Sequence, residues 1–223
     1  LVKQQHLDPA SRLQGLQAAQ IAALSTDQIR VLGTAQIANL ETSQIKALTA
    51  AQLGAMSTSQ IAAIETQDLE QLTAAQIKGL TTDGVKALTT GQIGAMKYAQ
   101  IAALSTDQIA QVSTGGIAQL STDQVKALTA AQLGALSTSQ IAAIETQDLV
   151  ELTAAQLKNL GSDSIKALTT SQAAALTATQ VASLSANQIQ AMETQDLAKV
   201  STSGIQALTA NQVKALTTGQ VQN

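Results

Sequence analysis

The chain repeats itself every eight residues, and this period limits what it can fold into more than any other feature. From Leu16 to Leu216 every eighth residue is apolar, and a second apolar series with the same spacing runs from Ile21 to Val221, where only Ala173 is small. Numbered 1 to 8 from the first series, a repeat reads roughly Leu-[Ser/Thr]-[Thr/Ala]-x-Gln-[Ile/Val/Leu]-x-Ala. Twenty-six repeats fill residues 16–223, which leaves no internal linker.

A continuous helix or strand does not fit this spacing. With 3.6 residues per turn, eight residues rotate an apolar stripe by about 80°. The mean apolar spacing of four residues also exceeds the roughly 3.67 residues per turn of a right-handed supercoil. Alternating intervals of five and three residues do not match the two-residue period of a strand. The pattern therefore favours a helix that ends and restarts in every repeat.

Helix-start signals recur in register with the repeat. Position 2 is Ser or Thr in 18 of the 26 repeats, and position 5 is Gln in 19. Together they form a capping box, in which each side chain satisfies a backbone N–H at the start of a helix, and positions 1 and 6 become the partners of a hydrophobic staple. Twelve of the 15 acidic residues lie at positions 2 to 5 and eight of the 12 basic residues at position 7, as the helix dipole favours.

Helices of about six residues must be held by neighbours, because isolated helices shorter than about 12 residues are marginal in water. We therefore predict an all-α solenoid, or superhelix, of about 26 very short helices in residues 16–223, in which each repeat stacks on others. Residues 1–15 are expected to form a degenerate N-terminal cap, where Asp8 and Pro9 suit the N-cap and first helical positions.

A second period of 40 residues overlies the first. Lysines at position 7 and glycines at position 7 both follow it, at Lys46, Lys86, Lys126 and Lys166 and at Gly54, Gly94 and Gly134. One interpretation is that about five helices make one superhelical turn, which would place the four lysines along one side. The alternative is duplication history alone, since residues 48–80 and 128–160 match at 28 of 33 positions.

The composition offers little for chemistry. The chain has no Cys, one His (His6) and one aromatic residue (Tyr98). We therefore expect no enzyme and no cofactor, and assign no catalytic, cofactor-binding or metal-ligating residue. A net charge of −3 argues against a nucleic-acid binder that works by charge. No apolar run approaches the roughly 18 residues of a membrane span, so we expect no membrane insertion.

A few local features could still bind a ligand. Paired carboxylates recur in three segments, Glu65–Asp68, Glu145–Asp148 and Glu193–Asp196. Oxygen ligands suit Ca²⁺, but two carboxylates are too few for a dedicated site, so acidic variants of the helix start are expected. Gly115-Gly116 and Gly161 lack the spacing of phosphate-binding loops. The recurring Thr and Ser at positions 2 and 3 could present hydroxyl groups to ice or a glycan, and Tyr98 is a candidate exposed aromatic.

The array in residues 16–223 resembles low-complexity LT-x-x-Q-[IV]-x-A octapeptide arrays of large bacterial secreted or surface proteins. This resemblance implies a structural or spacer module, secreted or at the cell surface, beside neighbouring repeats of a longer parent chain. An alternative is a superhelical, adhesin-like scaffold that binds a protein, peptide or glycan. Repeats such as residues 120–128 and 208–216 also resemble the opening of the TAL-effector DNA-binding repeat. The second helix and base-reading loop of that family are absent here, so nucleic-acid binding is the last alternative.

Overall fold

The computed structural model describes residues 13–222, and all regular structure within this range is helical. One helix of four to six residues lies in each of the 26 repeats, which confirms the predicted all-α array. Most of the expected N-terminal cap in residues 1–15, including His6, Asp8 and Pro9, falls outside the described residues.

The helices belong to two compact units, Leu1–Val112 (unit 1) and Ser113–Asn223 (unit 2). The described helices of unit 1 are α2 (Ala18–Ala22), α3 (Thr26–Arg30), α4 (Thr34–Ala38), α5 (Thr42–Ala47), α6 (Ala50–Ala55), α7 (Thr58–Ala62), α8 (Thr66–Leu69), α9 (Ala74–Lys78), α10 (Thr82–Lys86), α11 (Thr90–Ala95), α12 (Tyr98–Ala103) and α13 (Thr106–Ile109). Those of unit 2 are α14 (Thr114–Ala118), α15 (Thr122–Ala127), α16 (Ala130–Ala135), α17 (Thr138–Ala142), α18 (Thr146–Leu149), α19 (Ala154–Lys158), α20 (Ser162–Lys166), α21 (Thr170–Ala175), α22 (Ala178–Ser183), α23 (Ala186–Ala191), α24 (Thr194–Leu197), α25 (Thr202–Gln206), α26 (Ala210–Ala215) and α27 (Thr218–Gln222).

The hydroxyl residue at position 2 starts the helix, as predicted. Thr129 is typical: its backbone is extended, with φ −71° and ψ 157°, and its Oγ1 accepts the N–H of Gln132 at 3.2 Å. In return, the N–H of Thr129 donates to Oε1 of Gln132 at 2.8 Å. All 18 Ser and Thr residues at position 2 accept such a bond. The extended cap residue therefore interrupts the helix every eight residues.

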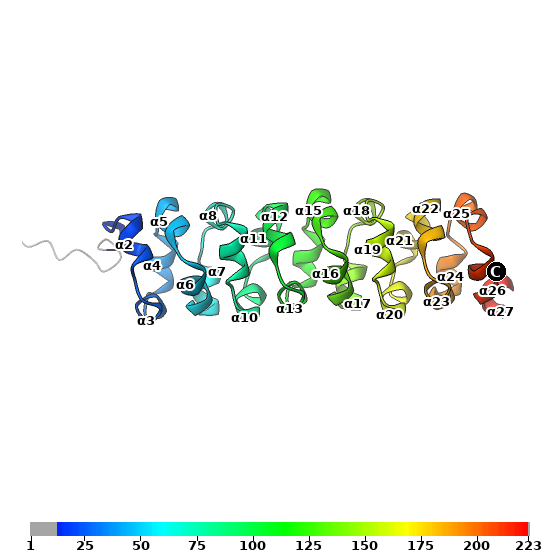
Figure 1. The fold of residues 1–223 in the computed structure, drawn as a ribbon, viewed down its shortest axis with the longest axis horizontal. Helices are drawn as coiled ribbons and strands as arrows, with labels where there is room; N and C mark the ends of the chain where they lie inside the picture. The colour runs from blue at the N-terminus through cyan, green and yellow to red at the C-terminus, as the bar shows by residue number, and fades with distance from the viewer. Residues whose placement is uncertain (1–12, 223) are drawn as a thin grey trace, which may run out of the picture. The chain divides into compact units, whose positions relative to one another are not determined.

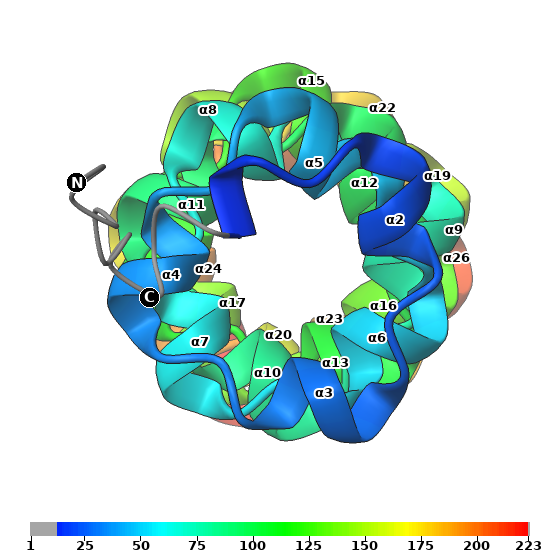
Figure 2. The same cartoon turned by 90° about the vertical axis from the view of Figure 1, so that its left-hand side faces the viewer.

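Each helix packs on the helix three repeats further along the chain. In unit 1, α2 contacts α5 and α3 contacts α6; in unit 2, α14 contacts α17 and α23 contacts α26. The helices of each unit thus wind around a common axis (Figures 1 and 2). The residues at positions 1 and 6 form the core between turns, where Ile61 and Ile141 are 0% exposed.

One turn of the superhelix contains fewer repeats than the 40-residue period predicts. Hydrogen bonds between successive turns join residues that are 28 to 31 positions apart, for example Gln60 to Leu32 and Ile29. Divided by eight, this corresponds to about three and a half to four repeats per turn, so the expectation of five is wrong.

The predicted row of lysines is wrong for the same reason. In unit 1, α5 with Lys46 and α10 with Lys86 lie on opposite sides of the axis. In unit 2, α15 with Lys126 and α20 with Lys166 are likewise opposed (Figures 1 and 2). Five repeats advance beyond one full turn, so residues 40 positions apart do not share a side.

Glycine allows two turns to approach closely in unit 1. A Cβ added to Gly54 in α6 would lie 2.7 Å from the carbonyl oxygen of Gly79, which follows α9. A Cβ added to Gly79 would lie 2.6 Å from both Cβ and the carbonyl oxygen of Ala50. Part of the 40-residue pattern therefore has a packing reason: Gly134 occupies the equivalent place in unit 2, against the carbonyl oxygen of Asn159.

Gly79→Ala is expected to lower the free energy of unfolding by about 1–3 kcal/mol, because the added methyl group overpacks against backbone atoms. Gly91→Ala is the matched control, since no heavy atom lies within 4 Å of its added Cβ. That change replaces Gly inside α11 and should raise the stability by up to about 1 kcal/mol. Urea denaturation followed by circular dichroism measures both, and equal effects of the same sign would contradict the close approach.

Candidate functional site

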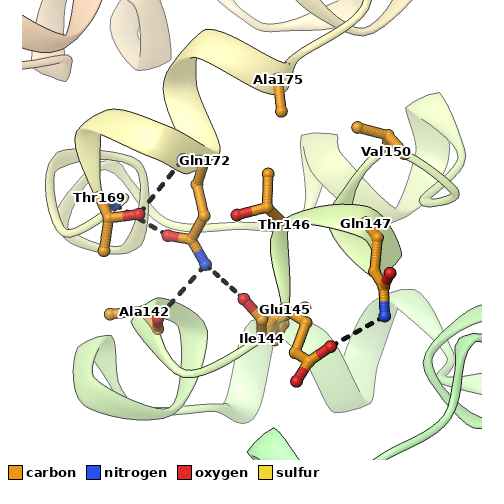
Figure 3. Close-up of a pocket in the computed structure, with 9 residues that line it drawn as sticks. All are labelled: Ala142, Ile144, Glu145, Thr146, Gln147, Val150, Thr169, Gln172 and Ala175. Atoms are coloured by element: carbon orange, nitrogen blue, oxygen red, sulfur yellow. Dashed lines mark hydrogen bonds between the residues drawn. The ribbon is translucent and has the colours of Figure 1, made fainter.

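The glutamine at position 5 has two sets of partners. In unit 2, Oε1 of Gln172 accepts the N–H of Thr169 at 2.8 Å, which completes the capping box of α21. Its Nε2 donates to the carbonyl oxygens of Ile144 at 2.8 Å and Ile141 at 3.0 Å, which belong to the preceding turn. Figure 3 shows the side chain of Gln172 reaching from α21 towards Ile144. One amide group therefore starts its own helix and binds the end of an earlier one.

The same arrangement recurs through both units. Glutamines whose Nε2 donates to carbonyl oxygens 28 to 31 residues earlier are Gln44, Gln52, Gln60, Gln76, Gln92, Gln100 and Gln108 in unit 1 and Gln156, Gln172, Gln180, Gln188, Gln212 and Gln220 in unit 2. We call this set the glutamine ladder. All of these side chains except Gln76 are buried.

The glutamine ladder accounts for the most frequent polar side chain of the repeat. The carbonyl groups at the end of a helix have no partner within that helix, and the ladder supplies donors to them. In the described part of the chain, no buried side-chain nitrogen or oxygen lacks a hydrogen-bond partner. The sequence indicated only the capping half of this role; the half that joins turns was missed.

In the three Glu-Thr-Gln-Asp segments, the two carboxylates point to different surroundings. Asp148, at position 5, is 1% exposed and accepts a hydrogen bond from Oγ1 of Thr122 in the preceding turn at 2.5 Å. Glu145 is exposed, and its Oε2 accepts from Nε2 of Gln147 at 2.9 Å. Equivalent bonds join Thr42 to Asp68 and Thr170 to Asp196.

This separation agrees with the interpretation of these segments as acidic variants of the helix start. Asp replaces Gln at position 5, and its shorter side chain accepts from a threonine instead of donating to carbonyl oxygens. Among residues 13–222, no group of three His, Cys, Asp or Glu side chains could hold a metal ion.

Asp148→Ala is expected to lower the free energy of unfolding by about 1–3 kcal/mol, because Thr122 loses its acceptor. Asp148→Asn keeps an acceptor oxygen and should recover most of this loss. The control is Asp163→Ala, which removes an exposed acidic residue from the first turn of α20 and should cost at most about 1 kcal/mol. Thermal unfolding that ranks Asp163→Ala as the more damaging change would contradict the role of the buried carboxylate.

A hollow lies beside each of the three segments. Its volume is about 660 Å³ beside Glu145 and about 400 Å³ beside Glu193 in unit 2, and about 640 Å³ beside Glu65 in unit 1. The Glu, Thr and Gln of the segment line all three. Figure 3 shows Thr146 and Gln147 of the segment with Val150 and Ala175 around the hollow. Each hollow thus combines a carboxylate, a hydroxyl and an amide group with small apolar surfaces.

The other candidate residues are not brought together into a site. Tyr98 begins α12 and is 61% exposed. Gly115 and Gly116 lie in α14, and Gly161 is the N-cap residue of α20. The hydroxyl groups at position 2 accept helix-capping bonds, so capping explains their recurrence.

Comparison with known families identifies the repeat. The model of the ALTTAQ repeat matches six stretches of the chain, residues 13–42, 31–64, 61–98, 101–138, 141–178 and 189–223. No curated protein matches the chain significantly. Within the described residues, no helix has the length and apolar character needed to cross a membrane.

Proposed function

Because this chain belongs to the ALTTAQ repeat family, we propose that it is a structural spacer module of a large bacterial extracellular or surface protein. On this proposal its partners are neighbouring repeats of a longer parent chain. It has no catalytic role and takes no cofactor.

The observation that carries this proposal is the glutamine ladder. Its hydrogen bonds join one turn to the next, so a force applied along the axis of a unit acts directly on them. Each helix interacts with the helix three repeats away, and such local, repeated contacts let a solenoid gain length by adding repeats. The polar groups that recur most often are used for cohesion between turns, which suits a spacer.

A single-molecule pulling experiment tests the mechanical role. The chain contains no Cys, so Ala35→Cys and Asp107→Cys, both at exposed sites in unit 1, create unique attachment points. We expect the 72 residues between them (107 − 35) to resist force, unfold in discrete steps that release roughly 250 Å, and refold on relaxation. Smooth extension without steps, as for a flexible chain, would contradict a spacer function.

The second candidate function is a scaffold that binds a glycan or peptide, and the three similar hollows favour it. Glycan and peptide arrays probed with the whole chain test this candidate. One reproducible ligand whose binding falls in Glu65→Ala and Glu145→Ala variants would favour the scaffold over the spacer. Retardation of duplex DNA at about 150 mM salt, where weak charge-driven binding is suppressed, would favour the TAL-like alternative instead.

A further inference from the structure

The last described turn exposes side chains that inner turns cover. Ile205, Val213 and Val221 occupy position 6 and are 42%, 52% and 69% exposed, whereas Ile141 and Leu157 at the same position are 0% exposed. A cavity of about 260 Å³ lies in this region, lined by Leu197, Ala198, Val200, Ile205, Leu208, Leu216 and Gln220. We call Ile205, Val213 and Val221, with the carbonyl groups beside them, the tail surface.

The first described turn exposes the opposite half of the same interface. Its position 6 residues, including Ile21 and Ile29, are buried, but the position 5 residues Gln20 and Gln28 are exposed. Oε1 of each glutamine accepts the N–H of its own N-cap residue at 2.8 Å. Nε2 of each makes no hydrogen bond to any residue that the structure describes. We call Gln20 and Gln28 the head surface.

The two surfaces match in chemistry and spacing. In inner turns, Nε2 of a ladder glutamine donates to carbonyl oxygens 28 and 31 residues earlier, at positions 1 and 6, as Gln188 does to Leu160 and Leu157. The equivalent carbonyl groups on the tail surface are those of Leu208 and Ile205, followed eight residues later by those of Leu216 and Val213. Gln20 and Gln28 are also eight residues apart, so both can meet their acceptors in one register.

We propose that the tail surface binds the head surface of a second copy of this chain, and that the contact reproduces the packing of one turn on the next. The contact joins two different surfaces, so it does not close on itself, and copies add in an open row. This proposal goes beyond a spacer of fixed length, because it gives the module a means to extend by association.

Variants that block one surface at a time test the proposal. Val213→Glu places a charge on the tail surface. Gln20→Glu with Gln28→Glu keeps the capping oxygen of each side chain but replaces the amide donor with a carboxylate that repels carbonyl groups. In sedimentation velocity, the natural chain should show a mass that rises with concentration beyond a dimer. Each blocked chain should self-associate about 100-fold more weakly or less, because an unpaired charge would be buried.

Mixing the two blocked chains gives the decisive result. Each retains one intact surface, so the mixture should form one-to-one dimers and nothing larger. Ala131→Glu adds the same charge at an exposed site in α16 and should associate like the natural chain. Circular dichroism verifies that every variant folds. A natural chain that stays monomeric up to about 1 mM, where even weak interfaces populate dimers, would overturn the proposal, as would a mixture that stays monomeric.

Discussion

Gln60→Glu is expected to lower the free energy of unfolding by about 3–5 kcal/mol, as breaking a buried polar pairing and leaving a charge does. Nε2 of Gln60 donates to the carbonyl oxygens of Ile29 and Leu32, both at 2.8 Å. Glutamate has nearly the same shape and keeps the oxygen that accepts the N–H of Ser57. It places a carboxylate against two carbonyl oxygens, so the change removes the bonds between turns and leaves the helix cap intact.

Gln28→Glu is the matched control for this prediction. Gln28 makes the same capping box with Ser25, but its side chain is exposed in the first described turn. Its replacement should change the stability by about 0.5 kcal/mol or less, as for an exposed surface residue. Urea denaturation of the two single variants gives the comparison. Equal losses would mean that glutamine matters only as a helix cap.

Ile141→Ala is expected to cost about 2–5 kcal/mol, through lost burial and the cavity that the smaller side chain leaves. Ile141 lies in α17 and is 0% exposed, because the following turn covers position 6. In a solenoid of very short helices without aromatic residues, these aliphatic side chains supply the core. The measurement is the midpoint and slope of urea denaturation, followed by circular dichroism at 222 nm.

Ile205→Ala tests whether burial sets this cost. Ile205 occupies the same position of its repeat in unit 2 but is 42% exposed. Its replacement should cost about 1–2 kcal/mol, since less apolar area is buried there. If Ile205→Ala were the more damaging of the two, the assignment of position 6 to the space between turns would be wrong.

Local features of the fold were predictable from the sequence because their physics is local. The bond from Ser57 to Gln60 spans three residues, so its signature appears directly in the repeat. The apolar character of positions 1 and 6 likewise predicted the core. These two signals sufficed for the helix boundaries and for a solenoid.

The number of repeats per turn was not predictable in this way. It depends on which earlier repeat each glutamine reaches, and that partner lies 28 to 31 residues away. The 40-residue period was a misleading substitute, because Gly54 and Gly79 preserve a close approach between α6 and α9 rather than a full turn. Similarly, the pairing of Glu145 with Asp148 in sequence gave no sign that Asp148 accepts from Thr122.

The side-chain amide exchange of the glutamines tests the central claim most directly. Nε2 protons of Gln52, Gln60 and Gln100 are bonded to carbonyl oxygens of the preceding turn, whereas those of Gln20 and Gln28 are on exposed side chains. Hydrogen exchange measured by nuclear magnetic resonance on monomeric chain should therefore be slow for the first three and fast for the other two. Uniformly fast exchange at all five glutamines would contradict a superhelix whose turns are joined by this side chain.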